Sequence, residues 1–327
     1  MNEACRCSRR QFVGSALAAA TAGGIVTALK GRAAEAMPPG AKAADPRNAL
    51  PTGAIGGLQV SRMLLGGNLL THYTHSRDLK YVYDLTARYN TEAKILETLA
   101  VAEQHGINTL SMHNPPGPMH ILKKYRREGG KIQWIICPTA PVNDAMDAYR
   151  QQVRELVDGG CEAIYLWGVH ADPLAAQGRV DLIAKAVEVA KEAGVPSGVG
   201  CHDLRVVIEC EKNKVPCDFY IKTFHHHRYP SGPTPEQLKA PTAEDHPAYW
   251  CRDPQQTIDV MKAVEKPWIA FKIMAAGAIP PPDAFRYAFE NGADHILVGM
   301  FDFEIGEDAG IARGILANVK RGRPWRS

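Results

Sequence analysis

Asp218-Phe-Tyr-Ile-Lys-Thr-Phe-His-His-His-Arg-Tyr229 is a short apolar run that contains one lysine and ends in three consecutive histidines. Apolar runs of this length, rich in aromatic and β-branched residues, are typical of buried β-strands. The imidazoles that follow can bind metal ions or transfer protons near neutral pH. An affinity tag would stand at a terminus, so we interpret this internal run as the end of a strand.

Seven similar apolar runs are spread along the chain, and helical patterns with apolar residues three or four apart lie between them. The eight expected strands are residues 62–68, 107–113, 132–138, 163–170, 196–202, 218–224, 268–274 and 295–300. Eight alternating strands and helices over about 270 residues are typical of a (β/α)8 TIM barrel. We therefore predict a single α/β barrel domain over residues 53–327.

A doubly wound sheet is the competing architecture. Such a sheet is expected to have a glycine-rich phosphate turn after its first strand, and Gly66-Gly67-Asn68 is too short for that turn. The longest insertion, residues 228–252, lies between the sixth and seventh strands, where it is expected to form part of a lid.

The first residues resemble a bacterial twin-arginine (Tat) signal. Ser8-Arg-Arg-Gln-Phe-Val13 is followed by an apolar run and by Ala34-Glu-Ala36, a cleavage-site pattern. A membrane anchor is less favoured, because the run is rich in alanine, glycine and threonine. We predict a cleaved signal (1–36), a disordered linker (37–52), recognition by the Tat export machinery, a periplasmic location and no membrane attachment after cleavage.

Charge and cysteine content restrict the function further. Removal of residues 1–36 takes away five of the 38 Lys and Arg and two of the 35 Asp and Glu, so the remaining chain has no net charge. Nucleic-acid binding is therefore not expected. We expect a small-molecule substrate instead. Three cysteines in apolar runs read as buried thiols, whereas Cys210, Cys217 and Cys251 could supply a disulfide.

Histidine stands at the ends of four expected strands, and a TIM barrel brings these ends to one face. The resulting prediction is a site for Zn, Mn, Fe or Ni, with His113, His170, His202, His225 and His227 as ligands. The alternative is a rim of separate, hydrogen-bonded histidines. Asp172 and Asp203 are candidate ligands or hydrogen-bond partners of the ligands.

Two lysines, Lys222 and Lys272, stand inside otherwise apolar strands. Each is expected to point into the barrel, because a charge among the helices would be costly. A desolvated lysine beside another cation has a lowered pKa and can act as a Schiff-base nucleophile or general base. Anchoring of a substrate carboxylate or phosphate is the other interpretation.

Further candidates for substrate binding stand after other strands. Small residues follow the seventh and eighth strands at Gly277 and Gly299, where barrels often bind phosphate through main-chain N–H groups. Asn68 and Thr139 follow the first and third strands, and Arg228 opens the long insertion.

Three segments resemble aldo/keto reductases. They are Gly-Gly-Leu-Gln-Val-Ser-Arg-Met-Leu-Leu-Gly-Gly at residues 56–67, Gly-Ile-Asn at 106–108 and Ile-Tyr-Leu-Trp-Gly-Val-His at 164–170. The resemblance extends over roughly residues 53–205. It implies a barrel whose base is capped by a short hairpin, with NAD(P)H as hydride donor.

That family's catalytic set is an aspartate, a tyrosine, a lysine and a histidine. Only the histidine carries over, onto His170. Ser111 stands near the aspartate position, Pro138 stands near the lysine position, and no tyrosine matches. The resemblance therefore implies the barrel more than the chemistry.

A shorter resemblance links residues 218–223 and 271–277 to the lysine motifs of deoxyribose-phosphate-type class I aldolases. It implies that Lys222 forms the Schiff base and that Lys272 lowers its pKa. The histidine run at 225–227 departs from that family's small phosphate-binding turn.

Together these features predict an exported enzyme for acid/base, metal-assisted isomerase- or lyase-type chemistry on a small polyhydroxylated or carboxylated substrate, such as a carbohydrate. Its expected catalytic residues are His170, Asp203, Lys222 and Lys272. The alternatives are an NAD(P)-dependent oxidoreductase, a Schiff-base aldolase that uses Lys222, and a periplasmic binding protein without catalytic activity.

Overall fold

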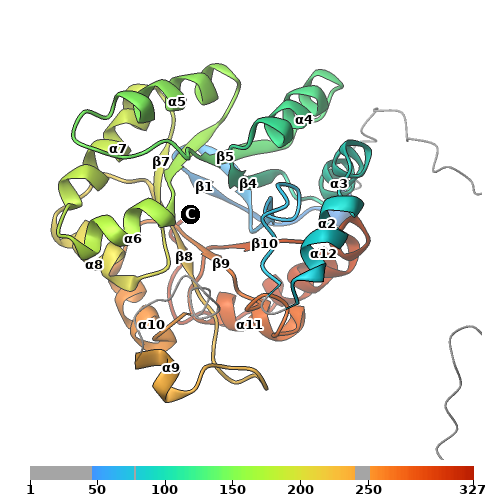
Figure 1. Ribbon diagram of the computed structural model, residues 1–327. Helices are drawn as coiled ribbons and strands as arrows, with labels where there is room; N and C mark the ends of the chain where they lie inside the picture. Colours follow the sequence, from blue (N-terminus) through green and yellow to red (C-terminus); the bar gives the residue numbers. More distant parts are fainter. Residues whose placement is uncertain (1–45, 77–78, 240–250) are drawn as a thin grey trace, which may run out of the picture. The chain divides into compact units, whose positions relative to one another are not determined.

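The computed structural model describes residues 46–76, 79–239 and 251–327 (Figure 1). The expected signal, residues 1–36, and most of the expected linker lie outside these ranges. The last linker residues pack on the barrel, because Leu50 is buried and Arg313 donates a hydrogen bond to the Asn48 carbonyl at 3.0 Å. The folded part of the chain therefore begins before residue 53.

The described chain forms a closed barrel of eight parallel strands in the order β10-β3-β4-β5-β6-β7-β8-β9 (Figure 1). The strands are β3 (Met63–Gly66), β4 (Thr109–His113), β5 (Gln133–Cys137), β6 (Ala163–Leu166), β7 (Ser197–Cys201), β8 (Phe219–Thr223), β9 (Trp268–Phe271) and β10 (His295–Val298). All eight lie within the expected segments. The prediction of a TIM barrel is confirmed.

Helices surround this barrel. They are α2 (Tyr81–Tyr89), α3 (Glu92–Gln104), α4 (Pro116–Arg127), α5 (Asp147–Asp158), α6 (Gly168–Ala176), α7 (Val180–Glu192), α8 (Leu204–Lys212), α9 (Pro235–Lys239), α10 (Pro254–Ala263), α11 (Pro281–Glu290) and α12 (Asp302–Leu316). Local sequence sets several of their starts: Thr91 and Asp253 cap α3 and α10, and prolines open α10 and α11. Among the described residues, no helix is both long and apolar enough to cross a membrane.

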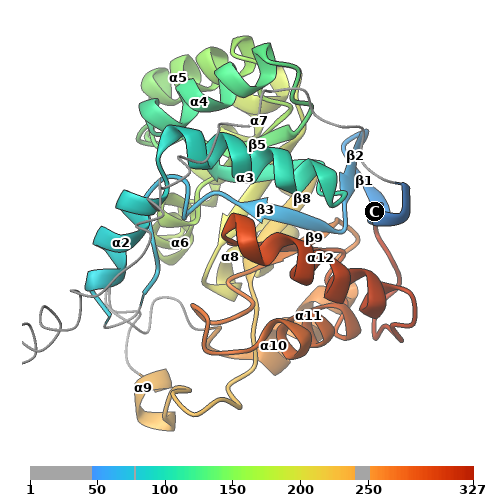
Figure 2. The same ribbon diagram turned by 90° about the vertical axis from the view of Figure 1, so that its right-hand side faces the viewer.

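Side chains alternate between two apolar cores, as expected for strands with a period of two. The barrel interior contains Leu64, Ile135, Tyr165, Phe219, Ile221 and Ile269, whereas residues of opposite parity pack against the helices. The hairpin of β1 (Thr52–Ile55) and β2 (Leu58–Ser61) adds Ile55 and Val60 to the interior core. Figure 2 shows this hairpin and the C-terminus at one end of the barrel and α2 at the other.

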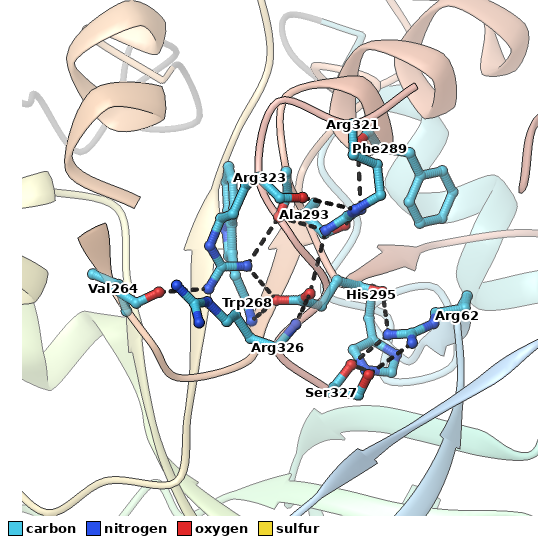
Figure 3. Close-up of polar contacts among 12 residues, drawn as sticks. Arg62, Val264, Trp268, Phe289, Ala293, His295, Arg321, Arg323, Arg326 and Ser327 are labelled. Atoms are coloured by element: carbon cyan, nitrogen blue, oxygen red, sulfur yellow. Dashed lines mark hydrogen bonds and ion pairs between the residues drawn. The ribbon is translucent and has the colours of Figure 1, made fainter. Parts of the chain in front are cut away.

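Buried charges join the C-terminal segment to the base of the barrel (Figure 3). Asp294, just before β10, accepts hydrogen bonds from Arg323 at 2.5 Å and from the main chain of Trp268 at 2.9 Å. Trp325 lies between the guanidinium groups of Arg62 and Arg321, at 4.0 and 3.4 Å from its ring centre. The starts of β3, β9 and β10 are thus held together at the end opposite the strand C-termini.

Candidate active site

Lys272 is the first residue after β9, and its backbone has left the strand conformation. Its φ angle is 55°, and Ala275 and Ala276 follow with φ of 48° and 57°. These are three of the six non-glycine residues with positive φ in the described chain. Such conformations are costly for residues with a Cβ and cluster at functional sites. The loop therefore stores strain where it presents the lysine amine.

Lys272, His202 and Asp172 form a hydrogen-bonded chain across the strand ends. Lys272 Nζ donates to His202 Nε2 at 2.9 Å, and His202 Nδ1 donates to Asp172 Oδ2 at 2.7 Å. Asp172 on α6 also accepts from the main-chain N–H groups of His202 and Asp203, both at 3.0 Å. The carboxylate thus fixes the His202 tautomer that leaves a lone pair facing Lys272.

The electrostatic environment favours uncharged nitrogen at this site. Burial lowers the pKa of Lys272 to about 7, against a smaller opposing effect of Asp172. Burial and the nearby Lys272 charge lower the pKa of His202, and the Asp172 carboxylate partly offsets this. At neutral pH a substantial fraction of Lys272 is therefore a neutral amine, the nucleophilic and basic form.

His75, in the loop after β3, also belongs to this site. Burial, followed by the Lys272 and His202 charges, lowers its pKa to about 2. The Asn68 amide donates to His75 Nε2 at 3.3 Å, so the predicted substrate-binding residue Asn68 lies beside the site. Sequence reasoning did not select His75, because its loop lacks an apolar run to place it.

An aromatic arc continues from His75 around the mouth of the barrel. Tyr73 contacts both His75 and His113 edge-on, with ring centres 5.4 and 5.5 Å apart. The His113 ring lies parallel to Trp167 at 6.0 Å, and Trp167 contacts His170 at 5.7 Å. A Cβ on Gly168 would lie 3.2 Å from His202 Nδ1. The arc therefore ends beside the hydrogen-bonded chain of Asp172, His202 and Lys272, which we call the relay.

Lys222 lies differently from its expected place. It has the same parity on β8 as Tyr220 and Phe224, which pack on the helix side, whereas Phe219 and Ile221 fill the interior. The side chain is 1% exposed, and Nζ donates to the Thr223 carbonyl at 2.8 Å. The prediction that Lys222 points into the barrel is wrong, because strand parity places this side chain on the helix side, where its amine donates to a main-chain carbonyl.

The three consecutive histidines hold the ends of the long insertion. His225 Nδ1 donates to the His226 carbonyl at 3.0 Å, and its Nε2 accepts from the Cys251 N–H at 2.8 Å. His227 hydrogen-bonds to the Cys251 carbonyl, and His226 Nε2 pairs with Asp283 at 3.2 Å. Both ring nitrogens of His225 are thus used by the protein itself.

The predicted metal ligands do not assemble into one site. Across residues 46–76, 79–239 and 251–327, no group of three or more His, Cys, Asp or Glu side chains is arranged to hold a metal ion. His113 and His170 belong to the aromatic arc, His202 to the relay, and His225 and His227 to the insertion. The alternative of a rim of separately hydrogen-bonded histidines describes this arrangement better.

The other candidates occupy the ends of neighbouring strands. Asp203 caps α8 by accepting from the Arg205 N–H at 2.8 Å, so Asp172 rather than Asp203 contacts the His202 ring. The Thr139 main chain partly offsets the lowering of the His170 pKa by burial. Arg228 lies 6.0 Å from the Tyr287 ring centre. Gly277, with φ of 83°, and Gly299 follow β9 and β10, and their roles stay predictions.

The thiols are not part of the site. The six cysteines of the described chain are free and buried, including the three that were candidates for a disulfide. Burial raises the pKa of Cys137 and Cys161 to about 12, so neither forms a thiolate at neutral pH.

No known family model matches this sequence, and no curated protein does either. Among solved structures, a truncated 3-deoxy-D-arabino-heptulosonate 7-phosphate synthase from Thermotoga maritima matches with a TM-score of 0.50 at 9% identity, over 84% of this chain and 95% of that chain. Gox0644 matches with a TM-score of 0.52 at 10% identity, over 84% and 90%. A Gox0644 mutant in complex with NADPH gives 0.52 at 12% identity, over 83% and 89%. These likenesses establish the TIM-barrel fold, which several kinds of enzyme share.

Proposed function

We propose that this protein is an enzyme that acts on a small carbonyl compound by lyase- or isomerase-type chemistry, with Lys272 as its reactive amine. The observation that carries the proposal is the hydrogen-bonded chain from Asp172 through His202 to Lys272. A half-buried lysine held by a neutral imidazole at the C-terminal ends of barrel strands is placed as a nucleophile or base. We assign to Lys272 the formation of the Schiff base, which the aldolase resemblance implied for Lys222.

The proposed reaction begins with attack of the Lys272 lone pair on the carbonyl carbon. The amine nitrogen loses a proton to His202 Nε2, and the former carbonyl oxygen takes one from a solvent water molecule, which gives a carbinolamine. Asp172 stabilises the imidazolium that forms on His202. The His202 imidazolium then gives its proton to the hydroxyl group, which leaves as water, and an iminium forms on Lys272.

The iminium then serves as the electron sink. It accepts the electron pair released when an adjacent C–H or C–C bond breaks, so that isomerisation or cleavage becomes possible. The iminium thus takes the place of the metal assistance that was predicted from the sequence. Hydrolysis of the product iminium regenerates the free amine.

Selective capture of carbonyl compounds at Lys272 tests this proposal. At pH 7 an amine with a pKa near 7 has roughly a thousandfold more neutral form than an ordinary lysine. The imine that glycolaldehyde forms is therefore expected to be trapped by sodium borohydride first at Lys272. Peptide mass spectrometry of the digested protein locates the adduct. Exposed Lys262 is the internal control. Equal modification of Lys262 and Lys272 would contradict the proposal that Lys272 is the reactive amine.

Asp172→Asn is expected to slow capture at Lys272 by roughly tenfold or more. The asparagine amide can donate to His202 Nδ1 and so favour the tautomer that no longer accepts from Lys272. Asp203→Asn is the matched control, because asparagine also caps helices and Asp203 does not contact the His202 ring. Equal rates in the two variants would contradict the relay.

A further inference from the structure

The aromatic arc beside Lys272 shows which carbonyl compounds the site can hold. Resting on the proposed function, we infer that the substrate is an uncharged polyhydroxylated aldehyde or ketone, not a phosphate ester. Its carbonyl carbon reaches Lys272, and its carbon chain lies along the arc of Tyr73, His113, Trp167 and His170. Three features of the described residues, together with the Lys272 amine itself, carry this inference.

The first feature is a cluster of aromatic rings at the barrel mouth, which we call the aromatic wall and in which His113 and Trp167 stack. The Trp167 and His113 rings are within 4° of parallel, and Tyr73 and His170 meet them edge-on. The faces of aromatic rings carry partial negative charge, which suits the slightly positive C–H groups of a polyol chain. A wall of this kind binds a carbon skeleton without requiring charge on the ligand.

The second feature is a set of uncharged hydrogen-bond acceptors. Burial lowers the pKa of both His113 and His170, so their imidazoles are neutral at pH 7. His170 Nε2 is buried and has no hydrogen-bond partner among the described residues. In a neutral imidazole one ring nitrogen donates and the other accepts, so Nε2 can form one hydrogen bond with a ligand. A hydroxyl group of the substrate would satisfy it.

The third feature is the closure of the usual phosphate position. Barrels commonly bind phosphate at the helix start that follows their last strands. Here the first turn of α12 contains Asp302 and Glu304, and Glu304 accepts the Phe301 N–H at 2.8 Å. Asp302 is held there by Lys94 at 3.1 Å. Glu304 already occupies one N–H group of this helix start and adds a negative charge, so a phosphate is disfavoured there.

The protonation state of the Lys272 amine also favours an uncharged substrate. A phosphate dianion beside Lys272 would favour the ammonium form and remove the nucleophile that the buried site provides. An uncharged substrate leaves that balance unchanged. All four observations are therefore consistent with one substrate class, the uncharged polyhydroxylated aldehydes and ketones. They are the aromatic wall, the uncharged acceptors, the carboxylates at the start of α12 and the neutral amine.

Matched aldehyde pairs test the inference. D-glyceraldehyde is compared with D-glyceraldehyde 3-phosphate, and D-erythrose with D-erythrose 4-phosphate, at equal free-aldehyde concentration, by borohydride capture at Lys272. We expect at least roughly tenfold faster capture of the uncharged member of each pair. Trp167→Ala should slow D-erythrose capture by a similar factor, and Trp167→Phe should restore much of it. Phe303→Ala, an exposed change on α12, is the control expected to leave every rate unchanged.

The outcomes separate the two proposals. Phosphate esters that react as fast as their uncharged partners would overturn the substrate class while Lys272 stays the reactive amine. Loss of this reaction in Arg228→Gln would then identify Arg228 as the anion anchor. Absence of any Lys272 adduct would overturn the proposed function, and the inference that rests on it falls too. Unchanged D-erythrose capture in Trp167→Ala would contradict the aromatic wall.

Discussion

Lys272→Met is expected to abolish carbonyl capture and yet to raise the free energy of unfolding by roughly 1–3 kcal/mol at pH 7. A pKa near 7 in the folded protein, against about 10.4 in an unfolded chain, costs the wild type about 4 kcal/mol at this pH. Methionine removes that cost but leaves His202 Nε2 without its donor, which takes back about 1–3 kcal/mol.

The sign of this effect depends on pH. Between pH 7 and about 10.4 an unfolded chain holds the Lys272 proton more tightly than the folded protein does. The unfavourable contribution of Lys272 therefore shrinks as the pH rises, and the advantage of Lys272→Met should fall by roughly 3 kcal/mol between pH 7 and pH 10. Urea unfolding of both proteins at the two pH values measures this difference.

Lys262→Met is the matched control for that measurement. The Lys262 side chain is 50% exposed beside Asp259, so its replacement should change stability by less than about 0.5 kcal/mol at either pH. If Lys272→Met were destabilised equally at both pH values, Lys272 would be an ordinary charged lysine and the site would lose its neutral amine.

Asp294→Asn is expected to destabilise the protein by roughly 3–5 kcal/mol, because it leaves buried cations without their carboxylate. The Asp294 and Arg323 side chains are both 0% exposed, and Arg321 is 6% exposed. Asparagine keeps the volume and part of the hydrogen bonding, so the loss measures the charge. The midpoint of guanidinium unfolding is the readout.

Asp259→Asn is the control, since its pair with Lys262 is largely exposed and should contribute less than about 1 kcal/mol. Replacing Asp294 and Arg323 together by leucine and methionine should cost less than the sum of the single changes, because no unpaired charge is left. Additive losses would show that the two residues do not interact as described.

The fold could be predicted because each strand carries its own apolar run and each turn separates it from a helical pattern. The same patterns also placed the strand ends, where His113, His202 and Lys272 stand. What the pattern could not give is the direction of a side chain beyond the last strand residue. Lys272 leaves β9 with positive φ, and a conformation of that kind is set by the packing of the whole loop.

Lys222 and the histidine run show a second limit. Chemistry alone favours a lysine that points into the barrel and histidines that bind metal. Strand parity and a nearby carbonyl instead stabilise Lys222 on the helix side, and main-chain groups 24 to 26 residues away use the imidazoles of His225 and His227. Contacts at such sequence separation leave no mark in the local pattern.

The hydrogen bonds that His225 and His227 make to Cys251 also bear on how the length of the connecting segment could change. Once the two ends of a connecting segment are fixed, each doubling of its length adds only about 0.6 kcal/mol of closure entropy. We therefore expect insertions and deletions between Arg228 and Cys251 to change the free energy of unfolding little. The hydrogen bonds to Cys251 would keep β8 and α10 in place. Changes of length in this segment are therefore expected to leave Lys272 in its place.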